Sequence, residues 1–555
     1  MKNKLALTMI SNIAKQYSKS SFTDKPVGNT SINSVHRLGF AQTRSQILKT
    51  EFSFKSLFSY FFFDYFRNMS IIIFLVSSSY LFASENMEDD FKKSIVQVKI
   101  TAQNPNFMFP WQPKKPYNIE AVGIVISKDK ILTLASNLEY TSSIEVKKFS
   151  SYKNFPAKIL KIDYESNLAI LSLEDTSFYL DLIPIDFVNK PEITKPVSIV
   201  QLDNAGSIQF SKGRLTGMDM DYSSTGHTEL PYISLNSNEK LDGNGELITD
   251  KGKALGILFK FNNSKNSGKA IPGFVLNYFV NNIMKSKQSP FPFKGFKYRA
   301  LVDTAQKEFY GLDKNREGVI ISEIIPYTGA DKLLEPNDII VEFGGRKIDS
   351  QGFFQHSDYG KQSLSFLAHT GEEFGFKRGK KLPVKIIRNK KELTLMLPLR
   401  SFPLRAIRIP YMHNSGRQPS YTIRGGFMFV ELSEFLLREW GANWRSKVDK
   451  KLLYLCDYKK FQSNDESGRF LILIQTLPDE ANNGYHNVGM TLVTSLDGKP
   501  VRSVKELDVK INSSPNDIVL IDLEDGVTLA LDKTTLKQVD DRIARKFQIP
   551  ILSNY

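Results

Sequence analysis

Residues 131–138 (ILTLASNL) decide the fold of this chain, because a strand-forming run with three apolar residues in four leads directly into small and polar ones. Comparable short runs rich in β-branched residues recur on both sides, and clusters of Asp, Asn, Ser, Gly and Lys separate them. The clearest runs are residues 94–100, 121–126, 157–162 and 168–173. Short strands bounded by turn residues predict an all-β barrel or sandwich.

A helix is expected to close this β-rich region. After residues 270–273, four apolar side chains follow the i, i+3, i+4, i+7 spacing of one helix face, namely Leu276, Phe279, Val280 and Ile283. We therefore expect the first globular domain to span residues 87–287.

The composition is that of a multidomain globular protein. With 555 residues, 41% of them apolar, the chain is long enough for about three or four domains. The net charge of +15 is spread over short basic runs at apparent turns, which indicates either a solvated basic surface or a polyanion site. The single cysteine, Cys456, excludes an intramolecular disulfide, and six scattered histidines predict no metal site and no cofactor.

Residues 1–84 are expected to form an N-terminal extension. An apolar run at 71–82 follows Arg67 and precedes small residues and an acidic segment. Residues 69–84 are thus typical of a signal peptide. A membrane anchor is the alternative, although the run is shorter than the roughly 20 residues of a spanning helix. The depth of this segment in the chain raises the hypothesis that Met69 is the true start.

The order of motifs in the β-rich region resembles that of the HtrA/Deg serine proteases, which join a trypsin-like domain to PDZ modules. In that family a glycine-containing strand is followed by an ILTNAHVV segment, a DLALL strand, a GNSGGPL loop, a closing strand and an AIP turn. The matching segments here are 122–126, 131–138, 167–171 (NLAIL), 241–247 (LDGNGEL), 252–257 and 270–272. The resemblance implies a chymotrypsin-like double β-barrel at 87–287.

The resemblance also locates the three catalytic positions, and none carries its usual residue. Ser136 stands where the general-base histidine belongs, Asn167 where the orienting aspartate belongs, and Gly243 where the nucleophilic serine belongs. Triad chemistry needs an imidazole, a carboxylate and a hydroxyl. We therefore expect a degenerate triad, and the sequence has no histidine between His36 and His227 that could replace the missing base.

Several alternatives stay open at this stage. His227 is either a loop residue or a relocated base, and Ser234 or Ser237 near Lys240 could form a Ser-Lys pair. The glycines at 243–245 either preserve an oxyanion-binding loop or serve a tight turn with positive φ.

Residues 288–400 resemble a PDZ domain. Segments 318–326, 330–348 and 382–395 follow the family's strand, short helix and closing hairpin. A PDZ domain binds an extended peptide beside a strand, and backbone N–H groups of a loop hold the terminal carboxylate. The corresponding residues, for which peptide binding and a packing role are both open, are Tyr298, Arg299, Ala300 and Leu301, with alanine where glycine is usual.

Residues 401–555 resemble the second PDZ domain of plant-type Deg proteases. The resemblance rests on segments 419–421, 425–430, 454–455 and 484–485. The expected binding loop, which could instead hold subunits together, consists of Gly425, Gly426, Phe427 and Met428.

The sequence thus predicts a mainly β chain, with a chymotrypsin-like double β-barrel followed by two PDZ-like α+β domains. The leading functional hypothesis is a pseudoprotease that binds exposed peptide segments or C-termini of envelope proteins through its PDZ domains, as a scaffold or quality-control factor. The alternatives are an active serine endopeptidase with displaced catalytic residues and a surface interaction protein.

The resemblance further implies a homo-oligomer built from trimers. The expected location is outside the cytoplasm, in the periplasm or cell envelope, with the N-terminus either cleaved or membrane-anchored. No nucleic-acid partner is expected, and the basic exterior leaves peripheral membrane contact open.

Overall fold

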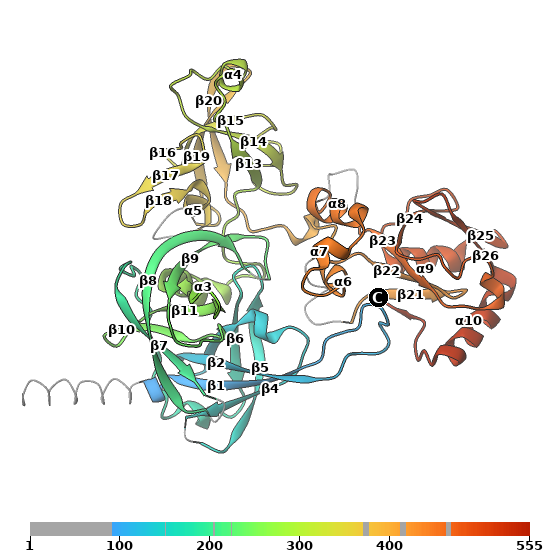
Figure 1. Ribbon diagram of the computed structural model, residues 1–555, viewed down its shortest axis with the longest axis horizontal. Helices are drawn as coiled ribbons and strands as arrows, with labels where there is room; N and C mark the ends of the chain where they lie inside the picture. Colours follow the sequence, from blue (N-terminus) through green and yellow to red (C-terminus); the bar gives the residue numbers. More distant parts are fainter. Residues whose placement is uncertain are drawn as a thin grey trace, which may run out of the picture. The chain divides into compact units, whose positions relative to one another are not determined.

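The described part of the chain is built mainly from strands (Figure 1). The computed structural model describes residues 91–149, 151–203, 206–223, 225–369, 377–410, 418–461 and 468–555. The predicted signal segment at 69–84 and the predicted start at Met69 lie outside these residues. None of the helices in the described ranges is both long and apolar enough to cross a bilayer.

The β-branched runs at the start of the described chain form a closed barrel, in the order β1-β2-β3-β6-β5-β4. Buried apolar side chains fill it, and Phe178 of the short helix η2 (Thr176–Tyr179) belongs to this core. The strands are β1 (Ile95–Ala102), β2 (Tyr117–Ser127), β3 (Lys130–Leu134), β4 (Thr141–Lys148), β5 (Asn154–Asp163) and β6 (Leu168–Leu173).

A second closed barrel follows, in the order β10-β11-β12-β9-β8-β7. Its strands are β7 (Pro196–Leu202), β8 (Ile208–Tyr222), β9 (Glu229–Asn236), β10 (Leu247–Asp250), β11 (Lys253–Asn262) and β12 (Ser267–Pro272). The predicted helix is α3 (Gly273–Ile283), and Leu276, Phe279 and Ile283 are buried as its spacing requires. The candidate catalytic positions lie on the turns that these strands hold in place.

The next region is an α+β module around a six-stranded sheet. Helix α5 (Leu364–His369) is buried along its whole length and packs against β9 of the second barrel. The remaining elements are β13 (Phe296–Ala300), α4 (Thr304–Phe309), β14 (Val319–Ile324), β15 (Ile339–Phe343), β16 (Arg346–Lys347), β17 (Phe353–His356), β18 (Gly360–Ser363), β19 (Lys381–Arg388) and β20 (Lys391–Pro398).

The last region is a second α+β module with a seven-stranded sheet, in the order β26-β25-β24-β23-β22-β21-β27. Its strands are β21 (Tyr421–Arg424), β22 (Phe427–Glu431), β23 (Leu471–Thr476), β24 (Thr491–Leu496), β25 (Ile518–Leu523), β26 (Thr528–Asp532) and β27 (Ser553–Asn554). Its helices are η3 (Leu404–Ala406), α6 (Glu434–Arg438), α7 (Trp444–Lys447), α8 (Lys450–Tyr458), η4 (Glu480–Asn482), α9 (Val504–Ser513) and α10 (Lys533–Phe547).

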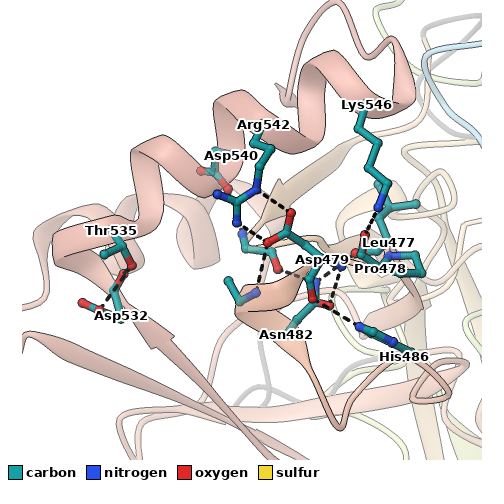
Figure 2. A network of polar contacts seen from close by, with 12 residues as sticks. Leu477, Pro478, Asp479, Asn482, His486, Asp532, Thr535, Asp540, Arg542 and Lys546 are labelled. Carbon is teal, nitrogen blue, oxygen red and sulfur yellow. Dashed lines mark hydrogen bonds and ion pairs between the residues drawn. The ribbon is translucent and has the colours of Figure 1, made fainter.

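Helix α10 is tied to the loop after β23 by a polar network (Figure 2). Asp479 accepts a bond of 2.8 Å from Nε of Arg542, and Nζ of Lys546 donates to the carbonyl of Pro478 at 2.8 Å. Asp479 also caps η4, and its backbone N–H donates to Oδ1 of Asn482 at 2.9 Å. Because the asparagine reaches the β21–β22 turn as well, the network connects helix, loop and hairpin.

This architecture confirms the predicted fold class, a mainly β chain with a double β-barrel followed by two α+β modules. The sequence could not choose between barrel and sandwich from its strand runs alone. The strand pairing decides for two barrels, because each six-stranded sheet closes on itself.

Candidate functional site

Two of the three predicted catalytic positions lie side by side. Ser136 is in the short helix η1 (Ala135–Leu138) directly after β3, and Asn167 directly precedes β6, which pairs with β3. The backbone N–H of Ser136 donates to Oδ1 of Asn167 at 2.7 Å. The amide nitrogen Nδ2 of Asn167 is buried without a hydrogen-bond partner among the described residues. This pair contains neither an imidazole nor a carboxylate.

Gly243 lies in the turn between β9 and β10, and backbone N–H groups of this turn donate to a side chain of the same turn. Oε1 of Glu246 accepts hydrogen bonds from the backbone N–H of Asp242 at 2.8 Å and of Gly243 at 2.9 Å. The N–H of Leu241 donates to Oδ1 of Asn263 at 3.2 Å. In an acyl-transfer site, backbone N–H groups of such a turn point at the developing oxyanion. Here they are used within the protein.

The acceptor carboxylate is deeply buried. Glu246 is 2% exposed, and burial raises the pKa of its carboxyl group. Its Oε2 has no partner among the described residues. Glu246 was not among the residues predicted from the sequence. Its position three residues after Gly243, in the loop where the family has proline, is the signal that could have found it.

The two glycines of this turn both have positive φ, +76° at Gly243 and +107° at Gly245. A Cβ atom built on Gly243 would lie 2.8 Å from Cα of Lys260. One built on Gly245 would lie 2.8 Å from the carbonyl oxygen of Val122. The geometry therefore favours the tight-turn interpretation of residues 243–245 over a free oxyanion loop.

His227 lies in the loop before β9 and contacts none of the three triad positions by a hydrogen bond within the described ranges. Its Nδ1 is 3.2 Å from Oε1 of Glu165, and its ring stacks on Phe402 with centroids 4.8 Å apart. Oε2 of Glu165 accepts from the N–H groups of His227 and Thr228. This arrangement favours the loop interpretation of His227.

The proposed Ser-Lys pair finds no support in the hydrogen bonds of the described residues. Oγ of Ser237 donates to the carbonyl of Lys212 at 2.7 Å and accepts from the N–H of Glu239 at 3.1 Å. Its hydroxyl thus stabilises a loop instead of facing Lys240. Ser234 lies within strand β9, paired with Lys269 and Gly217.

The predicted peptide-binding residues of the first PDZ-like module lie at the end of β13. Arg299 and Ala300 are exposed, whereas Leu301 is buried and its N–H donates to the carbonyl of Ser350 at 2.9 Å. Tyr298 is turned into the module, where burial raises the pKa of its phenol to about 12. Only the exposed pair is accessible to a partner.

The same module is joined to the second barrel by a buried ion pair. Nζ of Lys294 lies 2.7 Å from Oε2 of Glu229 and donates to Oγ of Ser365 at 2.9 Å. Burial alone would raise the pKa of Glu229, but the Lys294 ammonium holds it at about 2. Burial lowers the pKa of His369 to about 4, and its Nε2 accepts from the N–H of Lys294 at 3.0 Å. Sequence reasoning missed all of these contacts.

The predicted binding loop of the second PDZ-like module is a β-hairpin turn. Gly425 and Gly426 connect β21 to β22, with Arg424 paired to Phe427. The N–H of Gly425 donates to Oδ1 of Asp540 at 2.8 Å, and its carbonyl accepts from Nδ2 of Asn482 at 2.8 Å. Phe427 and Met428 are buried. A carboxylate could reach the Gly425 amide only if Asp540 moved away.

The described ranges hold no group of three or more His, Cys, Asp or Glu side chains placed to bind a metal ion. Fold and site together define a double-barrel, trypsin-like protein with PDZ-type modules.

Comparison with known proteins agrees with this class. A family model described as "PDZ domain" matches residues 409–553. The chain is 25% identical to "Protease Do-like 2, chloroplastic" of Arabidopsis thaliana, over 83% of this chain and 74% of that protein. It is 24% identical to "Protease Do-like 4, mitochondrial" of the same plant, over 83% and 85%.

Two further similarities cover a smaller part of this chain. The chain is 24% identical to "Serine protease DegP homolog" of Plasmodium falciparum (isolate 3D7), over 42% of this chain and 28% of that protein. The solved structure of "HtrA-type protease AlgW with decapeptide" has a TM-score of 0.44 at 16% identity, over 57% of this chain and 98% of that one. Over most of its length the chain is therefore similar in sequence to Do-like proteases, and its C-terminal region matches a PDZ domain.

Proposed function

We propose that this chain is a proteolytically inactive member of the HtrA/Deg family that binds protein segments. The observation that carries the proposal is the turn at Gly243, where Glu246 occupies the backbone N–H groups that a substrate carbonyl would need. A substrate would have to displace a buried carboxylate before its carbonyl could be polarised.

The residues at the triad positions support the same proposal. Ser136 has no group that accepts a proton near neutral pH, and Asn167 offers an amide instead of a carboxylate. Gly243 has no nucleophile. Because base, orienting group and nucleophile act as one unit, the absence of all three removes the mechanism, not one part of it.

Binding is proposed for the PDZ-like modules. Of the two predicted loops, the one at 298–301 is favoured because Arg299 and Ala300 are exposed, whereas Phe427 and Met428 are buried. An extended segment could add beside β13, with Arg299 attracting its carboxylate. The proposed partners are exposed segments or C-termini of proteins in the same compartment.

The location and assembly are also proposals. Relatives named chloroplastic and mitochondrial support a site of action outside the cytosol, reached by export or import, with the cell envelope as one case. Assembly into trimers is proposed from family membership alone.

The test is to incubate the full chain with casein, with trypsin as the positive control, and to screen it against a library of peptides with free C-termini. We expect no casein fragments above background. We also expect peptide affinities that fall on Arg299→Ala but not on Lys380→Ala, a change at another exposed cation of the same module. Casein cleavage that a serine-directed inhibitor abolishes would contradict the proposal.

A further inference from the structure

A cavity of about 840 Å³ is lined by residues of the first barrel, the end of α3, the first PDZ-like module and the start of the second. Its walls come from segments far apart in the sequence, namely 161–165, 283–289, 378–379 and 399–405, together with Tyr327. Ligand-binding pockets have volumes of roughly 300–1,000 Å³. The cavity has this size and lies apart from the turn at Gly243.

The lining carries an excess of positive charge. Five cationic side chains face two carboxylates, Asp163 and Glu165. The cations are Lys161, Lys287, Arg378, Arg400 and Arg405. Within the described ranges, the charged nitrogens of the first four, Arg405 excepted, have no carboxylate oxygen within 4.0 Å. Clustered cations without carboxylate partners attract an anion.

Arg378 is held in a fixed position for such a contact. Its Nη1 donates to Oγ of Ser286 at 2.7 Å, to Oγ of Ser401 at 3.2 Å and to the carbonyl of Ser289 at 3.3 Å. Nε and Nη2 make no hydrogen bond to any described residue. A guanidinium has five N–H donors and binds carboxylates in a two-point geometry, so the unused edge of Arg378 is available to an acidic group.

The two carboxylates are already committed to other partners. Oδ2 of Asp163 accepts from Oγ of Ser166 at 2.8 Å and from Oγ of Ser289 at 2.9 Å. Burial raises the pKa of Asp163 to about 6. Glu165 is engaged by the loop around His227. Neither carboxylate forms an ion pair with a cation of the cavity among the described residues.

Besides polar side chains such as Ser286, Gln288 and Ser401, the remaining walls contain apolar and aromatic ones. They include Ile162, Tyr164, Leu399 and Phe402, and the Arg405 guanidinium lies 4.2 Å from the centroid of the Tyr327 ring. A ligand that fits must combine negative charge with apolar groups. A flat bilayer surface cannot enter a concave site, so charge and shape together favour a protein segment.

We propose that this cavity binds an extended acidic peptide segment whose apolar side chains alternate with carboxylates. The site is distinct from both predicted PDZ loops and does not depend on the loss of proteolysis. It gives the positive charge of this face a specific role, because Lys161, Arg378 and Arg400 come from three different segments and converge only in the folded chain.

The test uses the full chain and a fluorescein-labelled peptide of alternating Glu and Leu, with binding followed by fluorescence anisotropy. We expect saturable binding that weakens as salt is raised, and weak or no binding of the same peptide with Gln in place of Glu. The double variant Lys161→Gln/Arg400→Gln should raise Kd about tenfold. Neither side chain forms a hydrogen bond or ion pair with another described residue, so folding should be unaffected.

The matched control is Lys253→Gln/Lys499→Gln, which removes the same charge at two exposed positions outside the cavity and should leave Kd within about twofold. Equal weakening by both double variants, or no saturable peptide binding, overturns the proposal. Binding of phosphatidylserine vesicles that requires Lys161 and Arg400, in the absence of peptide binding, overturns it in favour of a lipid. Casein cleavage does not bear on this result, so the two proposals fail separately.

Discussion

At Gly243 the backbone itself excludes a side chain. Its φ of +76° is a conformation that L-residues rarely adopt, and a Cβ atom would meet the backbone of Lys260 at 2.8 Å. A serine protease needs a hydroxyl at its nucleophile position, which the resemblance assigns to Gly243. The position that the resemblance assigns to the nucleophile therefore admits a side chain only if the turn or β11 shifts.

Gly243→Ser is expected to lower the free energy of unfolding by about 2–4 kcal/mol, because either the turn or β11 must shift to admit Cβ. The variant should also gain no activity on casein. The measurement is chemical denaturation at neutral pH. Gly217→Ser is the matched control, since a Cβ at Gly217 meets nothing within 4 Å. If both variants were equally stable, the turn would not be closed as described.

At the scale of elements, the β21–β22 hairpin shows that the predicted binding loop of the second PDZ-like module is covered by other parts of the same module. Its turn is covered by Asn482 from η4 and by Asp540 from α10. Helix α10 is held in turn by Arg542 on Asp479 (Figure 2). The Gly425 N–H, which could bind a peptide carboxylate, instead binds the Asp540 carboxylate of α10.

Gly426→Ala is expected to destabilise the protein by about 2–4 kcal/mol, because φ is +86° and the new Cβ would lie 2.3 Å from Nδ2 of Asn482. Gly498→Ala is the matched control. Its φ is +71° but no atom lies within 4 Å, so only the conformational cost of about 1 kcal/mol remains. Thermal unfolding measures the difference, and similar losses for both variants would contradict the role of the Asn482 contact.

The elements themselves were predicted well where their signal is local. The predicted runs beginning at Ile131 and Leu168 lie in β3 (Lys130–Leu134) and β6 (Leu168–Leu173), and the helical spacing that ends at Ile283 lies within α3 (Gly273–Ile283). The period of a strand or helix depends on neighbours in sequence, so these predictions needed no tertiary information.

At the scale of the whole molecule, the ion pair between Lys294 and Glu229 joins the first PDZ-like module to the second barrel. The pKa of Glu229 is about 2 in the folded protein against an ordinary 4.5. A carboxylate whose pKa is lowered by folding stabilises the folded state at pH values above its ordinary pKa. This stabilisation is lost as pH falls from about 4.5 towards 2.

Glu229→Gln should therefore lower the free energy of unfolding at pH 7 by about 3 kcal/mol, because it leaves the Lys294 ammonium buried without its partner. The loss should shrink as pH falls towards 2, where the wild-type carboxylate is protonated as well. Urea denaturation at pH 7 and at about pH 3 measures both effects.

Glu323→Gln is the control for this pair. It breaks an exposed ion pair with Lys297 and should change stability by less than about 1 kcal/mol. A Glu229→Gln protein with the wild-type pH dependence would show that the ion pair does not join the two regions.

The sequence by itself determined the β-rich architecture, the order of barrel and PDZ motifs, and the identities Ser136, Asn167 and Gly243 at the positions that the resemblance assigns to the triad. These features depend on local periodicity, motif order and residue identity. Only the tertiary structure decided that Glu246 closes the Gly243 turn and that Asp540 covers the Gly425 turn. It alone brings Lys161, Arg378 and Arg400 to one cavity. Such contacts join groups whose positions depend on how whole elements pack, and no sequence period encodes that packing.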